Sequence, residues 1–323
     1  MAARTPVRAG LATLALLLFL LSGCAEAAGS LDLAVDRPAA LRWDAGHHAG
    51  ALAADDQVWV IHEDGQGLQL AAKLSAPGVA HLAVGLDDGS IYASASEEGT
   101  LKRISLADGR LHASVPSGGP RPASLLYNPI LKRLASFNAG AGTVTLFDTA
   151  SNSFEGLIPL GDAPVAVQLS PDGRVLALLP ERLELVLLGM RPLRIFARWP
   201  LPAECTHPRD LALDSARQQV FVACGSERIA HFSLVEGSWQ ANWWGGAPGL
   251  AVVQLFWDGP RARLLAVTDA GSVQQAEPTA AAARALVTLP AGTLFDWDAN
   301  TARLLVLKPS GAGLHSLAFI SLP

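Results

Sequence analysis

The sequence has few charged residues, few aromatic residues and only three cysteines. Charged residues make up 16% of its 323 residues and hydrophobic residues 50%, so the chain can bury enough apolar surface to offset the entropy of ordering, which excludes a disordered chain. The 30 glycines and 21 prolines follow no period, which excludes a collagen-like fibre. After residue 22 no uncharged apolar stretch approaches the roughly 20 residues of a membrane-spanning helix, so we expect the bulk of the chain to be soluble.

The first 23 residues have the pattern of a secretion signal. Arg4 and Arg8 precede an almost purely aliphatic segment, Leu11 to Leu21, which is too short to span a membrane stably. The segment ends in Leu-Ser-Gly-Cys at residues 21–24, which resembles a bacterial lipobox. The resemblance implies cleavage before Cys24 and acylation of its sulfur and amino group. The alternative is an ordinary secreted protein in which this cysteine is incidental.

The residues after the signal predict a location. Two or more acyl chains anchor a protein stably, whereas one chain is marginal. Ala25, rather than Asp, follows Cys24, which by resemblance to proteobacterial sorting favours the outer membrane of a Gram-negative host, with the protein facing the periplasm. Residues 24–30 are the expected tether. Loss of Arg4 and Arg8 makes the formal net charge of −5 more negative, so no nucleic-acid partner is expected.

The rest of the chain repeats one pattern seven times: an apolar strand, a short turn rich in Asp, Asn, Gly and Pro, and a second apolar strand. The copies cover residues 51–61, 81–94, 124–137, 167–179, 210–224, 253–267 and 294–307. Their turn markers, Asp55, Asp87, Asn128, Ser170, Asp214, Asp258 and Asp298, are separated by 32, 41, 42, 44, 44 and 40 residues. A period in the low forties is typical of four-stranded propeller blades.

Several copies continue into a third and a fourth strand, as at residues 99–116 and 142–161, each with a second turn suited to a hairpin. The stretch from Gly142 to Leu179 resembles the YVTN-type repeats of seven-bladed propellers. Its three matching elements are Val144 to Thr149, with Leu146 in place of the second valine, Ile158 to Pro164, and Ser170 to Arg174. The resemblance is good in one blade, and it implies architecture rather than activity.

The predicted fold class is therefore all-β: a seven-bladed β-propeller of four-stranded antiparallel blades, with residues 31–323 forming a single, monomeric domain. The alternating segment Leu31 to Asp36 is expected to pair as the outermost strand of the last blade and close the ring, which would hide two sheet edges. A disordered lead-in is the alternative for this segment. A two-sheet sandwich or two small β domains would not explain seven copies in phase.

Cys205 precedes the first strand of the fifth copy and Cys224 ends its second strand. Folding this hairpin brings the two residues within reach, so a disulfide is expected in an oxidising compartment. A metal-binding or redox pair would favour the spacing C-x-x-C, which is absent. The eight histidines show none of the spacings H-x-x-x-H, H-E-x-x-H or C-x-x-C-H, so the sequence predicts no metal site and no cofactor.

The loops that precede the inner strands are the expected place for a ligand. They carry the candidate binding residues of the rim: Arg121, His207, Arg209, Trp243 and Trp244. Guanidinium groups and a tryptophan pair suit an anionic or peptide ligand through bidentate hydrogen bonds and stacking. The alternative is that the arginines pair with neighbouring acids and the tryptophans cap the core.

We therefore expect a lipid-anchored, non-enzymatic scaffold that binds a protein or another ligand in the cell envelope, with an envelope protein as partner. A propeller enzyme, such as a lactonase or a metal-dependent hydrolase, is the alternative. Enzymes of that architecture place His, Glu and Asp on the rim. There this chain offers few such groups: the adjacent Glu97 and Glu98, and Glu181, Glu227 and Asp269, each alone in its loop. No G-x-S-x-G motif occurs, and the sequence assigns no catalytic residue. Carboxylates or histidines that converge on the central channel would favour the enzyme, and an exposed apolar or cationic patch would favour the scaffold.

Overall fold

The computed structural model describes residues 29–85, 87–240, 243–245, 249–276, 283–298 and 300–323. The predicted signal, Cys24 and most of the tether lie outside these residues. Within the described ranges, no helix has the length and apolar character needed to cross a bilayer.

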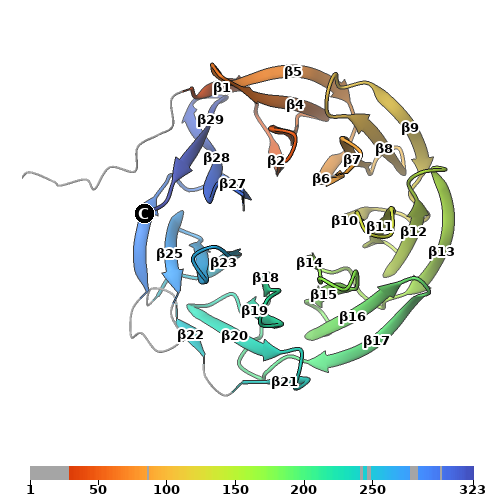
Figure 1. Ribbon diagram of the computed structural model, residues 1–323, viewed down its shortest axis with the longest axis vertical. Coiled ribbons are helices and arrows are strands. Elements are labelled where there is room, and N and C mark those ends of the chain that lie inside the picture. Colours follow the sequence, from red (N-terminus) through yellow and green to blue (C-terminus); the bar gives the residue numbers. More distant parts are fainter. Residues whose placement is uncertain (1–28, 86, 241–242, 246–248, 277–282, 299) are drawn as a thin grey trace, which may run out of the picture.

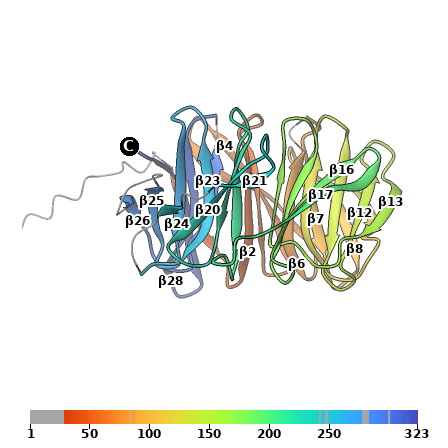
Figure 2. The same ribbon diagram turned by 90° about the horizontal axis from the view of Figure 1, so that it is seen from below.

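Seven antiparallel sheets stand in a ring around a central axis, which confirms the predicted β-propeller (Figure 1). The side view shows a disc whose thickness is set by the strand length (Figure 2). Blade 1 consists of β2 (Pro38–Asp44), β3 (Ala49–Ala54), β4 (Gln57–Asp64) and β5 (Gly67–Ser75). Blade 2 consists of β6 (Val79–Gly85), β7 (Ser90–Ala95), β8 (Thr100–Ser105) and β9 (Leu111–Pro116). Blade 3 consists of β10 (Pro122–Asn128), β11 (Arg133–Asn138), β12 (Thr143–Asp148) and β13 (Ser153–Pro159).

The remaining blades follow in chain order. Blade 4 consists of β14 (Ala166–Leu169), β15 (Val175–Leu179), β16 (Glu184–Met190) and β17 (Leu193–Pro200). Blade 5 consists of β18 (Asp210–Asp214), β19 (Gln219–Ala223), β20 (Arg228–Ser233) and two short outer strands, β21 (Ser238–Trp239) and β22 (Trp244–Gly245). Blade 6 consists of β23 (Val252–Asp258), β24 (Arg263–Thr268), β25 (Ser272–Ala276) and β26 (Arg284–Thr288). Blade 7 consists of β27 (Leu294–Asp298), β28 (Arg303–Gly311), β29 (Leu314–Ser321) and the N-terminal strand β1 (Leu31–Ala34).

In blades 3, 5 and 7 the turn marker at the end of the innermost strand accepts hydrogen bonds from backbone N–H groups of the turn that follows. In blade 7, for example, Asp298 Oδ1 accepts hydrogen bonds from the backbone N–H groups of Asn300 and Thr301, at 3.0 and 3.1 Å. The predicted first copy is displaced, since residues 51–61 contain the turn between β3 and β4. The true marker of blade 1 is Asp44, whose Oδ1 accepts from the backbone N–H of Gly46 at 2.8 Å. With Asp44 as the marker, the first spacing also falls in the low forties.

The core lies between the blades. The described residues form seven apolar clusters, one at each contact between neighbouring blades. Runs such as Val175–Leu179 in β15 are buried along their whole length because both faces of the sheet are covered. The high aliphatic content therefore stabilises contacts between blades, as expected from the sequence.

The ring closes through both ends of the described chain. β1 pairs antiparallel with β29, so Leu33 lies opposite His315 and the order of blade 7 is β1-β29-β28-β27. Leu33 and Val35 are buried in the cluster between blades 7 and 1. The predicted pairing of the segment that begins at Leu31 is thus confirmed.

The predicted disulfide is also present. Cys205 and Cys224 are joined with their Cα atoms 4.6 Å apart, and both side chains are buried in the cluster between blades 4 and 5. The bond ties the loop before β18 to the end of β19. It therefore fixes the loop that leads into the inner strand of blade 5.

Candidate functional site

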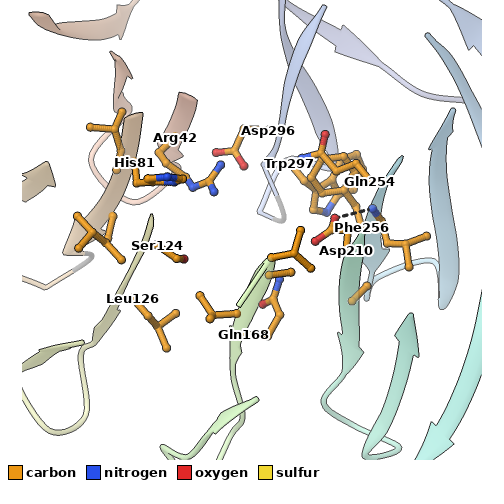
Figure 3. A pocket seen from close by; sticks show the side chains of 18 of the residues that line it. Arg42, His81, Ser124, Leu126, Gln168, Asp210, Gln254, Phe256, Asp296 and Trp297 are labelled. Atoms are coloured by element: carbon orange, nitrogen blue, oxygen red, sulfur yellow. Dashed lines mark hydrogen bonds between the residues drawn. The ribbon is translucent and has the colours of Figure 1, made fainter. Parts of the chain in front are cut away.

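A pocket of about 490 Å³ lies on the axis of the ring, where the inner strands of all seven blades converge (Figure 3). Alternate residues of a strand point to opposite faces. Each inner strand can therefore direct every second residue before its turn marker toward the axis. The first ring consists of Ala83, which lies four positions before Asp87, and of six residues that each lie two positions before their turn marker: Arg42, Leu126, Gln168, Ala212, Phe256 and Asp296. The second ring consists of His81, which lies six positions before Asp87, and of four residues that each lie four positions before their turn marker: Ser124, Ala166, Asp210 and Gln254.

Two carboxylates line the pocket, and each is held by the backbone of the next blade. Asp210 Oδ2 accepts a hydrogen bond from the N–H of Leu255 at 2.8 Å, and Asp296 Oδ2 accepts one from the N–H of Trp43 at 2.6 Å. Burial raises the pKa of Asp210 to about 6, although the hydrogen bond from Leu255 acts in the opposite direction. Burial likewise raises the pKa of Asp296, against the charge of Arg42. Both carboxyls are therefore fixed in position, while their ionised forms are poorly solvated.

A guanidinium group faces the same pocket. Arg42 is exposed to it, and its Nη1 donates a hydrogen bond to the backbone carbonyl of Leu41 at 2.8 Å. Within the described ranges Arg42 forms no ion pair with Asp210 or Asp296, but its charge lowers the pKa of both. Burial, aided by the same charge, lowers the pKa of His81 to about 4, so this imidazole is neutral at pH 7. Arg42 thus supplies a positive charge that no neighbouring carboxylate neutralises at close range.

The blades opposite these charges contribute neutral groups. Ser124 and Leu126 come from β10, and Ala166 and Gln168 come from β14. Figure 3 shows Leu126 and Gln168 on the side of the pocket away from Asp296. The wall is therefore charged on one part of its circumference and neutral on another.

The predicted rim residues do not line this pocket. Arg121, with a φ of 51°, lies exposed in the loop before β10. His207 and Arg209 lie exposed in the loop before β18, where His207 Nδ1 is 2.8 Å from the hydroxyl of Thr206. These three residues stand where the sequence placed them, on loops that lead into inner strands, but outside the set of residues that surround the axis.

The two tryptophans lie at the outer side of blade 5. Trp244 belongs to β22, which pairs with β20, and its ring centroid is 4.7 Å from that of Phe221. Trp243 packs against the cluster between blades 4 and 5, with the guanidinium carbon of Arg228 5.8 Å from its ring. Both indoles are half-buried, as expected if they cap the core.

The rim acids Glu97, Glu98, Glu181, Glu227 and Asp269 do not line the pocket either. Among them, Glu98 forms an ion pair of 3.0 Å with Lys102 on the same blade. No group of three or more His, Cys, Asp or Glu residues that could hold a metal ion occurs in the part of the chain that the structure describes. The histidine and the carboxylates that line the central channel are instead His81, Asp210 and Asp296, which the sequence alone did not identify.

A signal for these pocket residues exists in the repeats. A charged residue two or four positions before the turn marker stands out, because most other copies have Ala, Leu, Phe, Ser or Gln there. Asp210 and Asp296 follow from this rule. Arg42 does not follow, because the repeat pattern begins at residues 51–61, one hairpin after the inner strand β2 that carries this residue.

Comparison with known proteins gives no family for this chain: no protein-family model matches it, and no curated protein matches it. Its classification as a propeller rests on the repeats and on the seven sheets of the structure.

Proposed function

We propose that the protein is a lipid-anchored propeller that faces the periplasm and binds a small polar ligand in its central pocket without converting it. The observation that carries the proposal is the presence of Arg42, Asp210 and Asp296 in one pocket without ion pairs among them in the described structure. Uncompensated charges in a pocket destabilise the empty site. A ligand with complementary charges would remove that cost.

The size and rigidity of the site support binding. Its volume of about 490 Å³ falls in the range of small-molecule sites, about 300–1,000 Å³. Asp210 and Asp296 are oriented by backbone donors of neighbouring blades, so their positions are set by the ring itself. Such preorganisation lowers the entropy lost on binding.

A hydrolase that uses the same pocket is the second candidate. It is favoured by the convergence of two carboxyls and a histidine on the channel, and by the pKa of about 6 for Asp210, which suits a general base near neutral pH. Binding is preferred because the described residues provide no metal cluster, and because Ser124, the hydroxyl of the second ring, has no hydrogen bond to His81 there.

Native mass spectrometry can test the proposed pocket. The mature protein would be incubated with the small-molecule fraction of a Gram-negative envelope extract, and we expect a bound mass that Arg42→Gln loses. Arg121→Gln is the matched control, because this exposed arginine lies outside the pocket. Loss of the mass in Arg121→Gln but not in Arg42→Gln would place the ligand on the rim and contradict the proposal. Conversion of the bound mass over time by the wild type would support the hydrolase.

The anchor and the repeat type belong to the same proposal. The lipobox-like residues 21–24 support acylation of Cys24, and the segment 142–179 supports a YVTN-type propeller architecture. Cys24→Ser is expected to release a soluble periplasmic form or to block processing. An unchanged membrane fraction with unchanged electrophoretic mobility would contradict acylation.

A further inference from the structure

The charges of the central pocket are sorted around the ring. We name three arcs of its wall: the acidic arc of blades 5–7, with Asp210, Gln254 and Asp296; the basic arc of blades 1 and 2, with Arg42 and His81; and the neutral arc of blades 3 and 4, with Ser124, Leu126, Ala166 and Gln168. Figure 3 shows the labelled side chains of all three arcs around one cavity.

On this basis, and resting on the proposed binding role of the pocket, we propose that the ligand is a small zwitterion of the size of an amino acid or a dipeptide. Its ammonium group would contact the acidic arc and its carboxylate the basic arc. Its side chain would face the neutral arc.

The acidic arc provides acceptors for a cation. Each of its two carboxylates receives a backbone hydrogen bond at Oδ2, which leaves Oδ1 without a comparable bond from the neighbouring blade. Burial disfavours the charged form of both groups, as their raised pKa values indicate. An ammonium group at this position would supply hydrogen bonds and an opposite charge, so it would stabilise the ionised carboxylates.

The basic arc provides donors for an anion. The guanidinium of Arg42 uses Nη1 for the carbonyl of Leu41, so its remaining N–H groups are available for a carboxylate. His81 is neutral at pH 7 and can donate one N–H without adding charge. A bidentate contact between guanidinium and carboxylate is both strong and orienting.

The coexistence of the two arcs excludes ligands of one sign. A ligand with only positive charge would be repelled by Arg42, and a ligand with only negative charge would be repelled by Asp210 and Asp296. A zwitterion satisfies both arcs and leaves the pocket with no additional net charge. In the neutral arc, Leu126 and Ala166 favour an apolar side chain, and Gln168 can bind an amide or hydroxyl group.

Isothermal titration calorimetry at pH 7.5 can test the charge requirement with matched probes. L-leucine carries both charges, N-acetyl-L-leucine lacks the cation and L-leucinamide lacks the anion. The same three forms of Leu-Gly extend the set to dipeptides. We expect at least one zwitterion to bind at least tenfold more tightly than its acetylated and amidated forms.

The variants assign each charge to its arc. Asp210→Asn should reduce the preference over the N-acetyl form, and Arg42→Gln should reduce the preference over the amide, while Arg121→Gln should change neither. Both pocket variants keep a polar side chain of similar size, and circular dichroism and the unfolding midpoint would verify that they fold. Equal affinities for the charged and capped probes would overturn the inference.

The two experiments distinguish a failure of the proposed binding role from a failure of the zwitterion inference. If native mass spectrometry finds a bound mass that depends on Arg42 while no zwitterion binds, the pocket is a binding site and the zwitterion inference is wrong. If no bound mass and no zwitterion binding are found, both proposals are wrong.

Discussion

The carboxyl of Asp210 is surrounded by inner strands, and burial among them disfavours its ionised form. Its pKa of about 6 in the folded protein lies above the ordinary value of 3.8, so the folded state binds a proton more readily than the unfolded state. The resulting penalty is absent at pH values below the ordinary pKa, grows as the pH rises, and is complete above pH 6. Arg42, His81 and Asp296 face the same pocket and share this electrostatic environment.

The variant Asp210→Asn should therefore become more stable relative to the wild type as the pH rises from 4 to 7.5. Because water can reach the pocket, we expect a gain of about 1–2 kcal/mol over this interval rather than the full value that corresponds to the pKa shift. Denaturant unfolding at both pH values measures it. The exposed Asp32→Asn serves as control. A stability difference between Asp210→Asn and wild type that does not change with pH would contradict the raised pKa.

The side chain of Asp296 has a structural role that does not depend on its charge. Its Oδ2 accepts the backbone N–H of Trp43 across the contact between blades 7 and 1. Asp296→Ala would leave this donor without its partner, which should cost about 1–3 kcal/mol of unfolding free energy. Asp296→Asn retains an acceptor oxygen and should cost clearly less. Equal losses for both variants, measured by denaturant unfolding, would show that the hydrogen bond contributes nothing.

At the scale of the hairpin, the local pattern predicts strands reliably but does not distinguish one hairpin of a blade from the next. Residues 51–61 show an apolar strand, a turn at Asp55 and Asp56, and a second apolar strand, just as the inner hairpins do. They form β3 and β4, because the inner strand β2 already precedes them. Only the spacing of 32 residues to the next marker indicated the displacement. The repeat pattern therefore does not indicate that Arg42, on β2, faces the axis.

The outer edge of blade 5 shows a different limit of sequence analysis. Trp243 and Trp244 lie in a loop with glycines and were assigned to the rim, but β22 returns to pair with β20. This pairing brings Trp244 against Phe221. Neither the register of a two-residue strand nor its partner follows from local propensity, because packing against other strands of the blade decides both.

The disulfide acts on the same blade. Replacing both Cys205 and Cys224 by alanine should lower the unfolding free energy by about 3 kcal/mol, because the bond closes a loop of 19 residues in the unfolded chain. Dithiothreitol should lower the unfolding midpoint of the wild type and leave that of the double variant unchanged. If reduction has no effect on the wild type although mass spectrometry shows free thiols, the bond does not stabilise the blade.

On the scale of the whole molecule, blade 7 is assembled from both ends of the domain, so its integrity determines whether the ring is closed. β1 provides its outermost strand, and the contact with blade 1 is reinforced by Arg303, whose Nη1 and Nη2 donate to the carboxylate of Glu63 at 2.9 and 3.0 Å. The sequence predicted this closure from the alternating segment at Leu31. It could not predict the ion pair, whose partners are 240 residues apart.

Two substitutions on β1 test whether the packing of this strand between blades 7 and 1 is needed to close the ring. Leu33 is 2% exposed and packs between blades 7 and 1, whereas its neighbour Ala34 is exposed. Leu33→Asp would bury an unpaired carboxylate and should release β1, at a cost of more than about 3 kcal/mol. Ala34→Asp adds the same charge to the solvent side of the same strand and should cost less than about 1 kcal/mol.

Release of β1 would also expose the backbone edge of β29, which can pair with other chains. We therefore expect Leu33→Asp, but not Ala34→Asp, to form oligomers in size-exclusion chromatography and to unfold at a lower temperature. A Leu33→Asp protein that remains monomeric with wild-type stability would show that six complete blades and a three-stranded seventh are sufficient to close the propeller.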